Sequence, residues 1–233
     1  MTADSGRYAV YFAPEPNSPL ARFGAAWLGY DVAAGLPVAQ PGVPEIPAER
    51  LQAITAEPRR YGFHATLKPP FVPAADIEAD ALDNAIAMLA GRVAAFAAPR
   101  LRLACISGFW ALMLSEPCPM LDRLAERCVS ELDRFRAPPS TIELARRRSA
   151  GLSPRQEALL ARWGYPYVME EFRFHMTLTA RLDRDNGVEV GRVLSPLLES
   201  FCQDPLSIDA ICLFRQDRRE APFRLTRRYQ LAG

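Results

Sequence analysis

The two histidines of this chain stand in the same short sequence motif. Of 233 residues only two are histidine, and both begin a His-x-Thr-Leu tetrapeptide, at His64–Leu67 and His175–Leu178. Two such matches would arise by chance with a probability on the order of 10⁻⁵, so the repetition indicates a shared role. An imidazole has an unperturbed pKa of about 6.5, so a pair of them can supply one proton donor and one proton acceptor near neutral pH.

Both motifs stand in strand-like runs, at residues 61–67 and 172–182. The side chains of a strand alternate between its two faces. On the first run His64, Thr66 and Lys68 therefore share one face, opposite apolar neighbours. On the second run the corresponding face carries Arg173, His175, Thr177, Thr179 and Arg181. Each strand is thus expected to pack against a core on one side and to face a polar ligand on the other.

The balance of charged residues argues against ligands with a large charged surface. The 28 basic and 27 acidic residues give a net charge of +1, so no broad field of one sign is available to bind a long nucleic acid or an anionic membrane. A small anionic molecule bound by a local basic patch fits this balance, and Lys68, the only lysine, is a candidate phosphate contact. The N-terminus lacks a leader pattern, and no apolar run approaches the roughly 18 residues of a membrane span. We therefore expect a cytoplasmic protein.

Hydrophobic periodicity predicts alternating strands and helices, and so an α+β fold. The first strand is expected at Tyr8–Ala13, followed by a helix that Gly29 ends. Pro69-Pro70 is expected to end the strand after His64, and Asp76 to cap the next helix. Further helices are predicted after Pro119, from the capping box at Ser153, and along residues 190–201.

The second half of the chain repeats the order of the first. Each histidine motif is followed by a helix and then by a hairpin, at residues 101–114 and 206–231. This pattern predicts duplicated strand–helix–hairpin units in one bilobed domain, with two small, mostly antiparallel sheets flanking a central cleft lined by the histidine strands. The lobes are expected at about residues 1–137 and 153–233, joined by a connection at about 138–152 in which Arg146–Arg148 forms a solvated helix end.

A pair of imidazoles from facing lobes suits the cleavage of a phosphodiester. A base must activate the attacking oxygen and an acid must protonate the leaving oxygen, on opposite sides of phosphorus. Thr66 and Thr177 can donate hydrogen bonds to the non-bridging oxygens, while Lys68 or Arg173 balances the charge. Either histidine can be the base, and the roles exchange with the direction of reaction. The sequence shows no carboxylate cluster and no paired-cysteine spacing, so we expect no metal and no other cofactor.

The paired motifs resemble those of the two-histidine (2H) phosphoesterase superfamily, which includes cyclic phosphodiesterases and RNA-ligase-like enzymes. More of the chain is similar to one bacterial branch that is named for phosphonate metabolism and has no established function. The similarity lies in residues 7–12, 24–29, 61–71, 152–156 and 172–179. It implies a 2H phosphoesterase-like fold in which His64 and His175 are catalytic and both motif threonines hold the phosphate. Tyr11 and Tyr61, which lie in these segments, are expected to contact the substrate as well.

We therefore expect a metal-independent phosphodiesterase or cyclic phosphodiesterase that acts on a small phosphorylated sugar or nucleotide, in phosphonate utilisation. Two other functions stay open: a non-catalytic module that binds a nucleotide or sugar phosphate, and an RNA-end processing or ligase-like enzyme. A metal site is disfavoured because two histidines alone are an incomplete ligand set. The expected partner is a small phosphate ester, not a long nucleic acid or a membrane.

Overall fold

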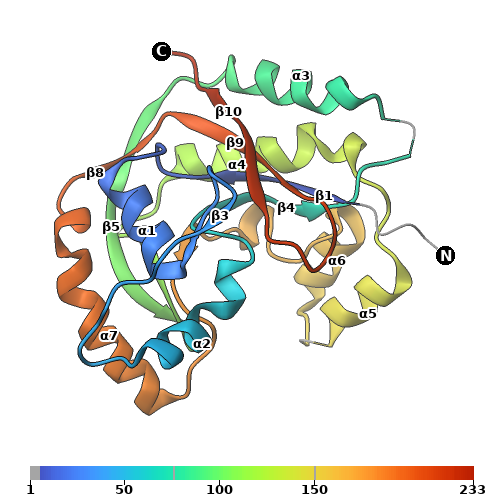
Figure 1. Cartoon of the computed structure of the whole chain (residues 1–233). Helices are drawn as coiled ribbons and strands as arrows, with labels where there is room; N and C mark the ends of the chain where they lie inside the picture. The colour runs from blue at the N-terminus through green and yellow to red at the C-terminus, as the bar shows by residue number, and fades with distance from the viewer. Residues whose placement is uncertain (1–5, 76, 150) are drawn as a thin grey trace.

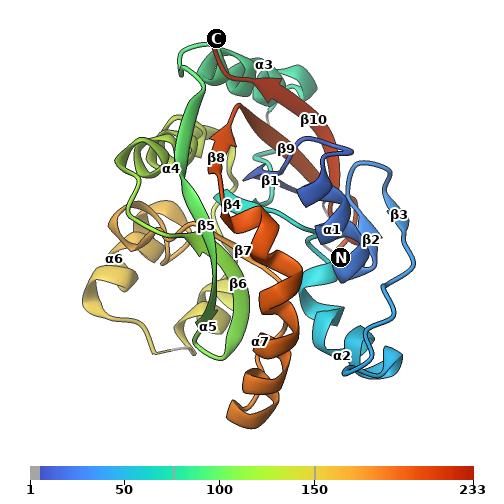
Figure 2. The same cartoon turned by 90° about the vertical axis from the view of Figure 1, so that its left-hand side faces the viewer.

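A curved antiparallel sheet carries both histidine motifs (Figure 1, Figure 2). The computed structural model describes residues 6–75, 77–149 and 151–233, and its large sheet has eight strands in the order β10-β9-β1-β4-β7-β6-β5-β8. These strands are β1 (Arg7–Phe12), β4 (Ala65–Phe71), β5 (Phe96–Ile106), β6 (Phe109–Leu114), β7 (His175–Thr177), β8 (Pro205–Ile208), β9 (Ala210–Gln216) and β10 (Arg224–Gln230). A separate small sheet pairs β2 (Tyr30–Asp31) with β3 (Leu36–Pro37). The expected α+β class with antiparallel strands is confirmed.

The two histidine strands meet in the middle of the large sheet. β4 and β7 are joined by one register pair, Ala65 with Met176, which divides the strand order into two halves of four strands. One half contains β10, β9, β1 and β4, and the other contains β7, β6, β5 and β8. The two small sheets expected from the duplication are therefore present as halves that touch edge to edge at the motifs.

The strands are not grouped as the expected lobes 1–137 and 153–233. The C-terminal hairpin of β9 and β10 lies beside β1, in the half that carries His64. The hairpin of β5 and β6, which precedes the connection, pairs with β7 in the half that carries His175. Each half of the sheet therefore contains a hairpin from the other part of the chain, so a boundary at residues 138–152 does not separate the two halves.

Local signals set the ends of several helices. α1 (Pro19–Leu28) begins after Ser18, whose side chain accepts a hydrogen bond from the Ala21 N–H at 3.2 Å, and it ends at Gly29 with a φ of 74°. α6 (Pro154–Trp163) begins with the predicted capping box of Ser153 and Gln156. The other helices are α2 (Ala48–Arg59), α3 (Ala79–Ala90), α4 (Pro119–Glu131), α5 (Thr141–Arg148) and α7 (Arg184–Leu198), with short 3₁₀ turns η1 (Asp133–Phe135), η2 (Met169–Glu171) and η3 (Glu199–Cys202). The predicted cap Asp76 lies outside the described residues.

Two strand boundaries differ from expectation. Pro69-Pro70 does not end β4, because Phe71 still pairs with Tyr8 of β1 after register shifts that accommodate the two residues. The run 206–214 is not one arm of a hairpin, since β8 pairs with β5 while β9 pairs with β10 and β1.

Apolar side chains on the two faces of the sheet form separate clusters. The larger one joins the sheet to α1, α3, α4 and α7, and it includes Trp27, Ile86, Leu124, Met176 and Leu194. The smaller one consists of Ala9, Tyr11, Ala13, Cys212, Phe214 and Phe223. On β1, Val10 and Phe12 belong to the larger cluster and Ala9 and Tyr11 to the smaller one, as strand alternation requires. All five cysteines are free.

Candidate active site

The junction of β4 and β7 brings the two motifs together. Ala65 and Met176, which pair across it, are both fully buried against the core. Continuing the antiparallel register by one residue to each side places His64 opposite Thr177 and Thr66 opposite His175. Because neighbours on a strand face opposite ways, these four side chains lie on the face away from the core. The two histidines and two threonines predicted from the motifs therefore share one site.

Each histidine is oriented by the same backbone contact. His64 Nδ1 lies 2.9 Å from the carbonyl oxygen of Gly62, and His175 Nδ1 lies 2.7 Å from that of Arg173. A carbonyl oxygen only accepts hydrogen bonds, so Nδ1 carries the proton in both neutral rings. Each Nε2 then has a free lone pair, and that of His64 lies 3.3 Å from the Thr66 hydroxyl. Both rings are set to take up a proton at Nε2.

Burial keeps both rings neutral. It lowers the pKa of His64 to about 4, with the hydrogen bond to Gly62 opposing the shift and the charge of His175 adding to it. The influence of His175 on His64 agrees with the closeness that the strand register requires. The pKa of His175 is also lowered by burial, and its hydrogen bond to Arg173 opposes that shift.

Aromatic side chains lie beside both imidazoles. The Tyr11 ring stacks on His64 with centroids 3.8 Å apart, and the Tyr61 ring lies 6.3 Å away. Phe109 lies 5.9 Å from the ring of His175. These contacts shield the imidazoles from water, which accounts for the direction of both pKa shifts. The predicted substrate contacts Tyr11 and Tyr61 are thus both beside His64.

A cavity of about 420 Å³ opens at the site. Its lining includes His64, Thr177, Tyr61, Phe109 and Arg181. Cavities of small-molecule sites usually measure about 300–1,000 Å³, so a sugar phosphate or a mononucleotide is of suitable size.

Lys68 does not face this cavity, contrary to the prediction. Thr66 pairs with Tyr11 and Lys68 with Val10, so two steps along β4 match one step along β1. This bulge moves Lys68 to the core face, where it is 2% exposed. Its ammonium group donates to the Val129 carbonyl at 3.1 Å and lies 3.5 Å from an Asp133 carboxylate oxygen. Burial lowers its pKa to about 8, and Asp133 opposes that shift.

The other predicted contact, Arg173, has an exposed side chain and meets His175 through its backbone carbonyl. Two further residues near the site, Thr179 and Arg7, were not among the predicted contacts. The Thr179 hydroxyl accepts a hydrogen bond from the Trp110 N–H at 2.9 Å, which ties the strand of His175 to β6. Arg7 lies on the same face of β1 as Tyr11, a placement that strand alternation alone could have indicated.

Comparisons with known proteins extend the description of the chain. Residues 66–224 match the model of a family described as "Protein of unknown function (DUF1045)". The chain is 39% identical over 231 residues to the protein named ribose 1,5-bisphosphate phosphokinase PhnN of Janthinobacterium sp. (strain Marseille), covering 97% of this chain and 51% of that protein. The protein of the same name from Laribacter hongkongensis (strain HLHK9) is 36% identical over 225 residues, covering 95% and 51%. The chain thus spans about half the length of the curated relatives it matches.

Two solved structures that align over nearly the whole chain share little sequence with it. The crystal structure of E. coli LigT complexed with NADP+ has a TM-score of 0.46 at 15% identity, covering 99% of this chain and 100% of that chain. A crystal structure described as a phosphoesterase has a TM-score of 0.42 at 15% identity, covering 98% and 99%.

Two further features concern metals and membranes. Within residues 6–75, 77–149 and 151–233, no three histidine, cysteine, aspartate or glutamate side chains gather as a group that could hold a metal ion. In the same part of the chain, no helix has both the length and the hydrophobicity to cross a bilayer.

Proposed function

We propose that this chain, which belongs to the DUF1045 family of proteins of unknown function, is a phosphodiesterase in which His64 and His175 act as general base and general acid. The matched orientation of the two rings carries this proposal. Each Nδ1 is fixed by the carbonyl two residues earlier, so each Nε2 is left to exchange a proton with a bound molecule. A site that only bound phosphate would be served as well by arginine, which cannot exchange protons near neutral pH.

In the proposed hydrolysis, the two rings act at opposite ends of one displacement. Nε2 of His64 takes a proton from water as the water oxygen bonds to phosphorus. The bond from phosphorus to the leaving oxygen breaks, and protonated His175 gives its Nε2 proton to that oxygen. The hydroxyls of Thr66 and Thr177 donate to the non-bridging oxygens, where negative charge must be stabilised.

We assign the base to His64 because its pKa of about 4 keeps the ring unprotonated at neutral pH. His175 is the acid in this direction, since the negative charge of a bound phosphodiester favours its protonated form. The assignment reverses when the reaction runs backward. The proposed step requires no metal ion.

The proposed substrate is a phosphodiester or cyclic phosphodiester of a small phosphorylated sugar or nucleotide. The cavity of about 420 Å³ supports this class, as does the net charge of +1, which provides little attraction for a long nucleic acid or a membrane. Relatives about twice as long are named for a phosphokinase of ribose 1,5-bisphosphate, and this supports a role with sugar phosphates. We place that proposed role in the cytoplasm and in phosphonate utilisation.

The test is hydrolysis of 2′,3′-cyclic AMP, followed by phosphorus NMR with and without a chelator. His64→Ala and His175→Ala should each lower kcat/KM by about 10²–10⁴-fold, and the double variant should lose much less than the product, because the two rings assist one step. The pH–rate profile of the wild-type protein should be bell-shaped. Arg192→Gln, at an exposed position of α7, is the matched control. Multiplicative losses and a flat profile from about pH 5 to 9 would instead support a phosphate-binding module.

A further inference from the structure

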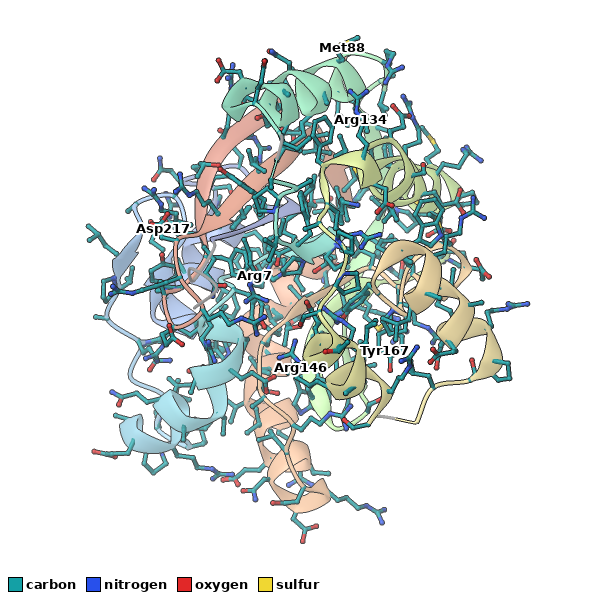
Figure 3. All side chains as sticks on the ribbon, turned by 90° about the vertical axis from the view of Figure 1, so that its right-hand side faces the viewer. Arg7, Met88, Arg134, Arg146, Tyr167 and Asp217 are labelled. Atoms are coloured by element: carbon teal, nitrogen blue, oxygen red, sulfur yellow. The ribbon has the colours of Figure 1, made fainter. Side chains whose placement is uncertain are left out.

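A cluster of aromatic and charged side chains extends from His64 along the same face of the sheet. The Phe223 ring is its centre: the Tyr61 ring lies 5.5 Å from it, the Tyr11 ring 6.1 Å and the guanidinium carbon of Arg7 5.4 Å. Tyr11 also stacks on His64. Figure 3 shows Arg7 near the middle of the face bordered by α2, α5 and the turn from β9 to β10. Arg7 therefore lies close to the site, although the motifs do not include it.

Arg7 is held in place by a buried side chain that leaves its terminal nitrogens free. Its Nε donates to the Gln216 side-chain oxygen at 2.8 Å, and Gln216 is 1% exposed. The Gln216 amide nitrogen donates in turn to the carbonyls of Arg219 and Ala221, at 3.1 Å and 2.7 Å. Within the described ranges, Arg7 Nη1 and Nη2 make no hydrogen bond and Arg7 forms no ion pair. An arginine oriented through Nε with a free fork of N–H groups is suited to bind an anion.

Hydroxyl groups beside Arg7 also lack partners. The Tyr11 side chain is fully buried, and its hydroxyl has no hydrogen-bond partner among the described residues. The Tyr61 hydroxyl makes no hydrogen bond in that part of the chain either, and Tyr61 lines the cavity of the site. An unpaired buried hydroxyl costs about 1–3 kcal/mol, a cost that a bound acceptor would remove.

Charged side chains of α5 lie near this cluster. Glu143, whose charge acts on Arg7, pairs with Arg147 at 2.7 Å, and Arg146 is an exposed neighbour on the same helix. The charge of Arg219 also acts on Arg7. The run Arg146–Arg148 is thus not wholly solvated, because Arg147 stacks over the Tyr165 ring at 4.5 Å. Glu143 pairs with Arg147 and Glu57 lines the cavity, so the positive charge of Arg7 and Arg219 is only partly balanced by nearby carboxylates.

We infer that Arg7 and the Tyr61 and Tyr11 hydroxyls bind a second anionic group of the substrate, a phosphate monoester, beside the phosphodiester held by the two motifs. This inference rests on the proposed phosphodiesterase function and makes the substrate a phosphodiester of a sugar that bears another phosphate. A phosphate monoester fits better than a carboxylate because its three terminal oxygens match a two-pronged guanidinium and two hydroxyls.

The experiment compares two probes, 2′,3′-cyclic AMP and the same compound with a 5′-phosphate. The wild-type protein should hydrolyse the 5′-phosphorylated probe with at least about 10-fold higher kcat/KM, the effect of one good hydrogen bond to a charged group. Arg7→Gln should abolish that ratio and Tyr61→Phe should reduce it, while Arg192→Gln should preserve it. Arg7→Lys, which keeps the charge but not the fork, should give an intermediate ratio.

Binding provides a second measurement that does not depend on turnover. By calorimetry, adenosine 2′,5′-bisphosphate should bind the wild-type protein at least about 10-fold more tightly than 2′-AMP, and Arg7→Gln should remove the difference. Equal preference for the paired probes, or a preference that survives both Arg7→Gln and Tyr61→Phe, would overturn the inference but not the phosphodiesterase. A binding preference without hydrolysis of either probe would overturn the phosphodiesterase and leave the second anion site in place. Should Arg7→Gln fail to fold, Tyr61→Phe decides the outcome, because the hydroxyl it removes has no partner in the described chain.

Discussion

Protonation of His64 is the property on which the proposed chemistry depends most directly. Burial lowers the pKa of this imidazole from 6.5 to about 4, so the folded protein favours the neutral ring by at most about 3 kcal/mol. The ring is only partly screened from solvent, and this value is therefore an upper bound. Because the chain has two histidines, both can be followed separately by long-range ¹H–¹⁵N NMR of the imidazole nitrogens.

At pH 7 both rings should be neutral with the proton on Nδ1, as their backbone contacts require. His64 should titrate at about pH 4, and His175 below its ordinary value of 6.5. His175→Gln removes the charge of His175, which lowers the pKa of His64 by less than burial does. The pKa of His64 should therefore rise in this variant while staying well below 6.5. Inorganic phosphate should raise the pKa of at least one ring, since an anion favours the protonated form.

The same shift links stability to pH. The unfolded chain takes up a proton on His64 near pH 6.5, whereas the folded chain does so only near pH 4. The free energy of unfolding should therefore fall as pH decreases through this window, and His64→Gln should weaken that dependence in urea titrations. A midpoint near 6.5 for His64, or a proton on Nε2 in the neutral ring, would refute the burial and tautomer on which the proposed base depends.

Three other variants test separate parts of the structure. Thr66→Val and Thr177→Val should each reduce kcat/KM for 2′,3′-cyclic AMP by about 10–150-fold, equivalent to 1.5–3 kcal/mol, with unchanged circular dichroism; full activity in both would show that phosphate is held elsewhere. Burial lowers the pKa of Lys68 to about 8, so the free energy of unfolding of the wild-type protein, measured by chemical denaturation, should rise relative to that of Lys68→Met between pH 8 and 10.5. The same substitution should change kcat/KM at pH 7 by less than about twofold. A large loss of activity in Lys68→Met would show that Lys68 does contribute to the active site. Gly24→Ala places a Cβ 2.1 Å from Phe63, the residue before His64, so it should lower the free energy of unfolding by about 1–3 kcal/mol, and an unchanged Tm would contradict the packing.

Local chemistry in the sequence determined the content of the site and many of the elements around it. The repeated tetrapeptide identified His64 and His175, and period-two alternation put a threonine beside each on the same face. Helix ends followed from residues that act within one turn: Gly29 adopts a positive φ at the end of α1, and Ser153 caps α6. These features depend on neighbours a few positions away, which is why the order of residues alone suffices to predict them.

The tertiary structure decided how these elements are combined. The sequence suggested contiguous lobes, but the sheet exchanges hairpins between the halves, because strand pairing depends on complementary edges that can be far apart in the chain. A single bulge opposite Val10 turned Lys68 to the core face, since one extra residue reverses the alternation of a strand. Arg7 is oriented by Gln216, 209 positions along the chain. No local periodicity records such a contact; it exists only because β1 and β9 are neighbours in the folded sheet.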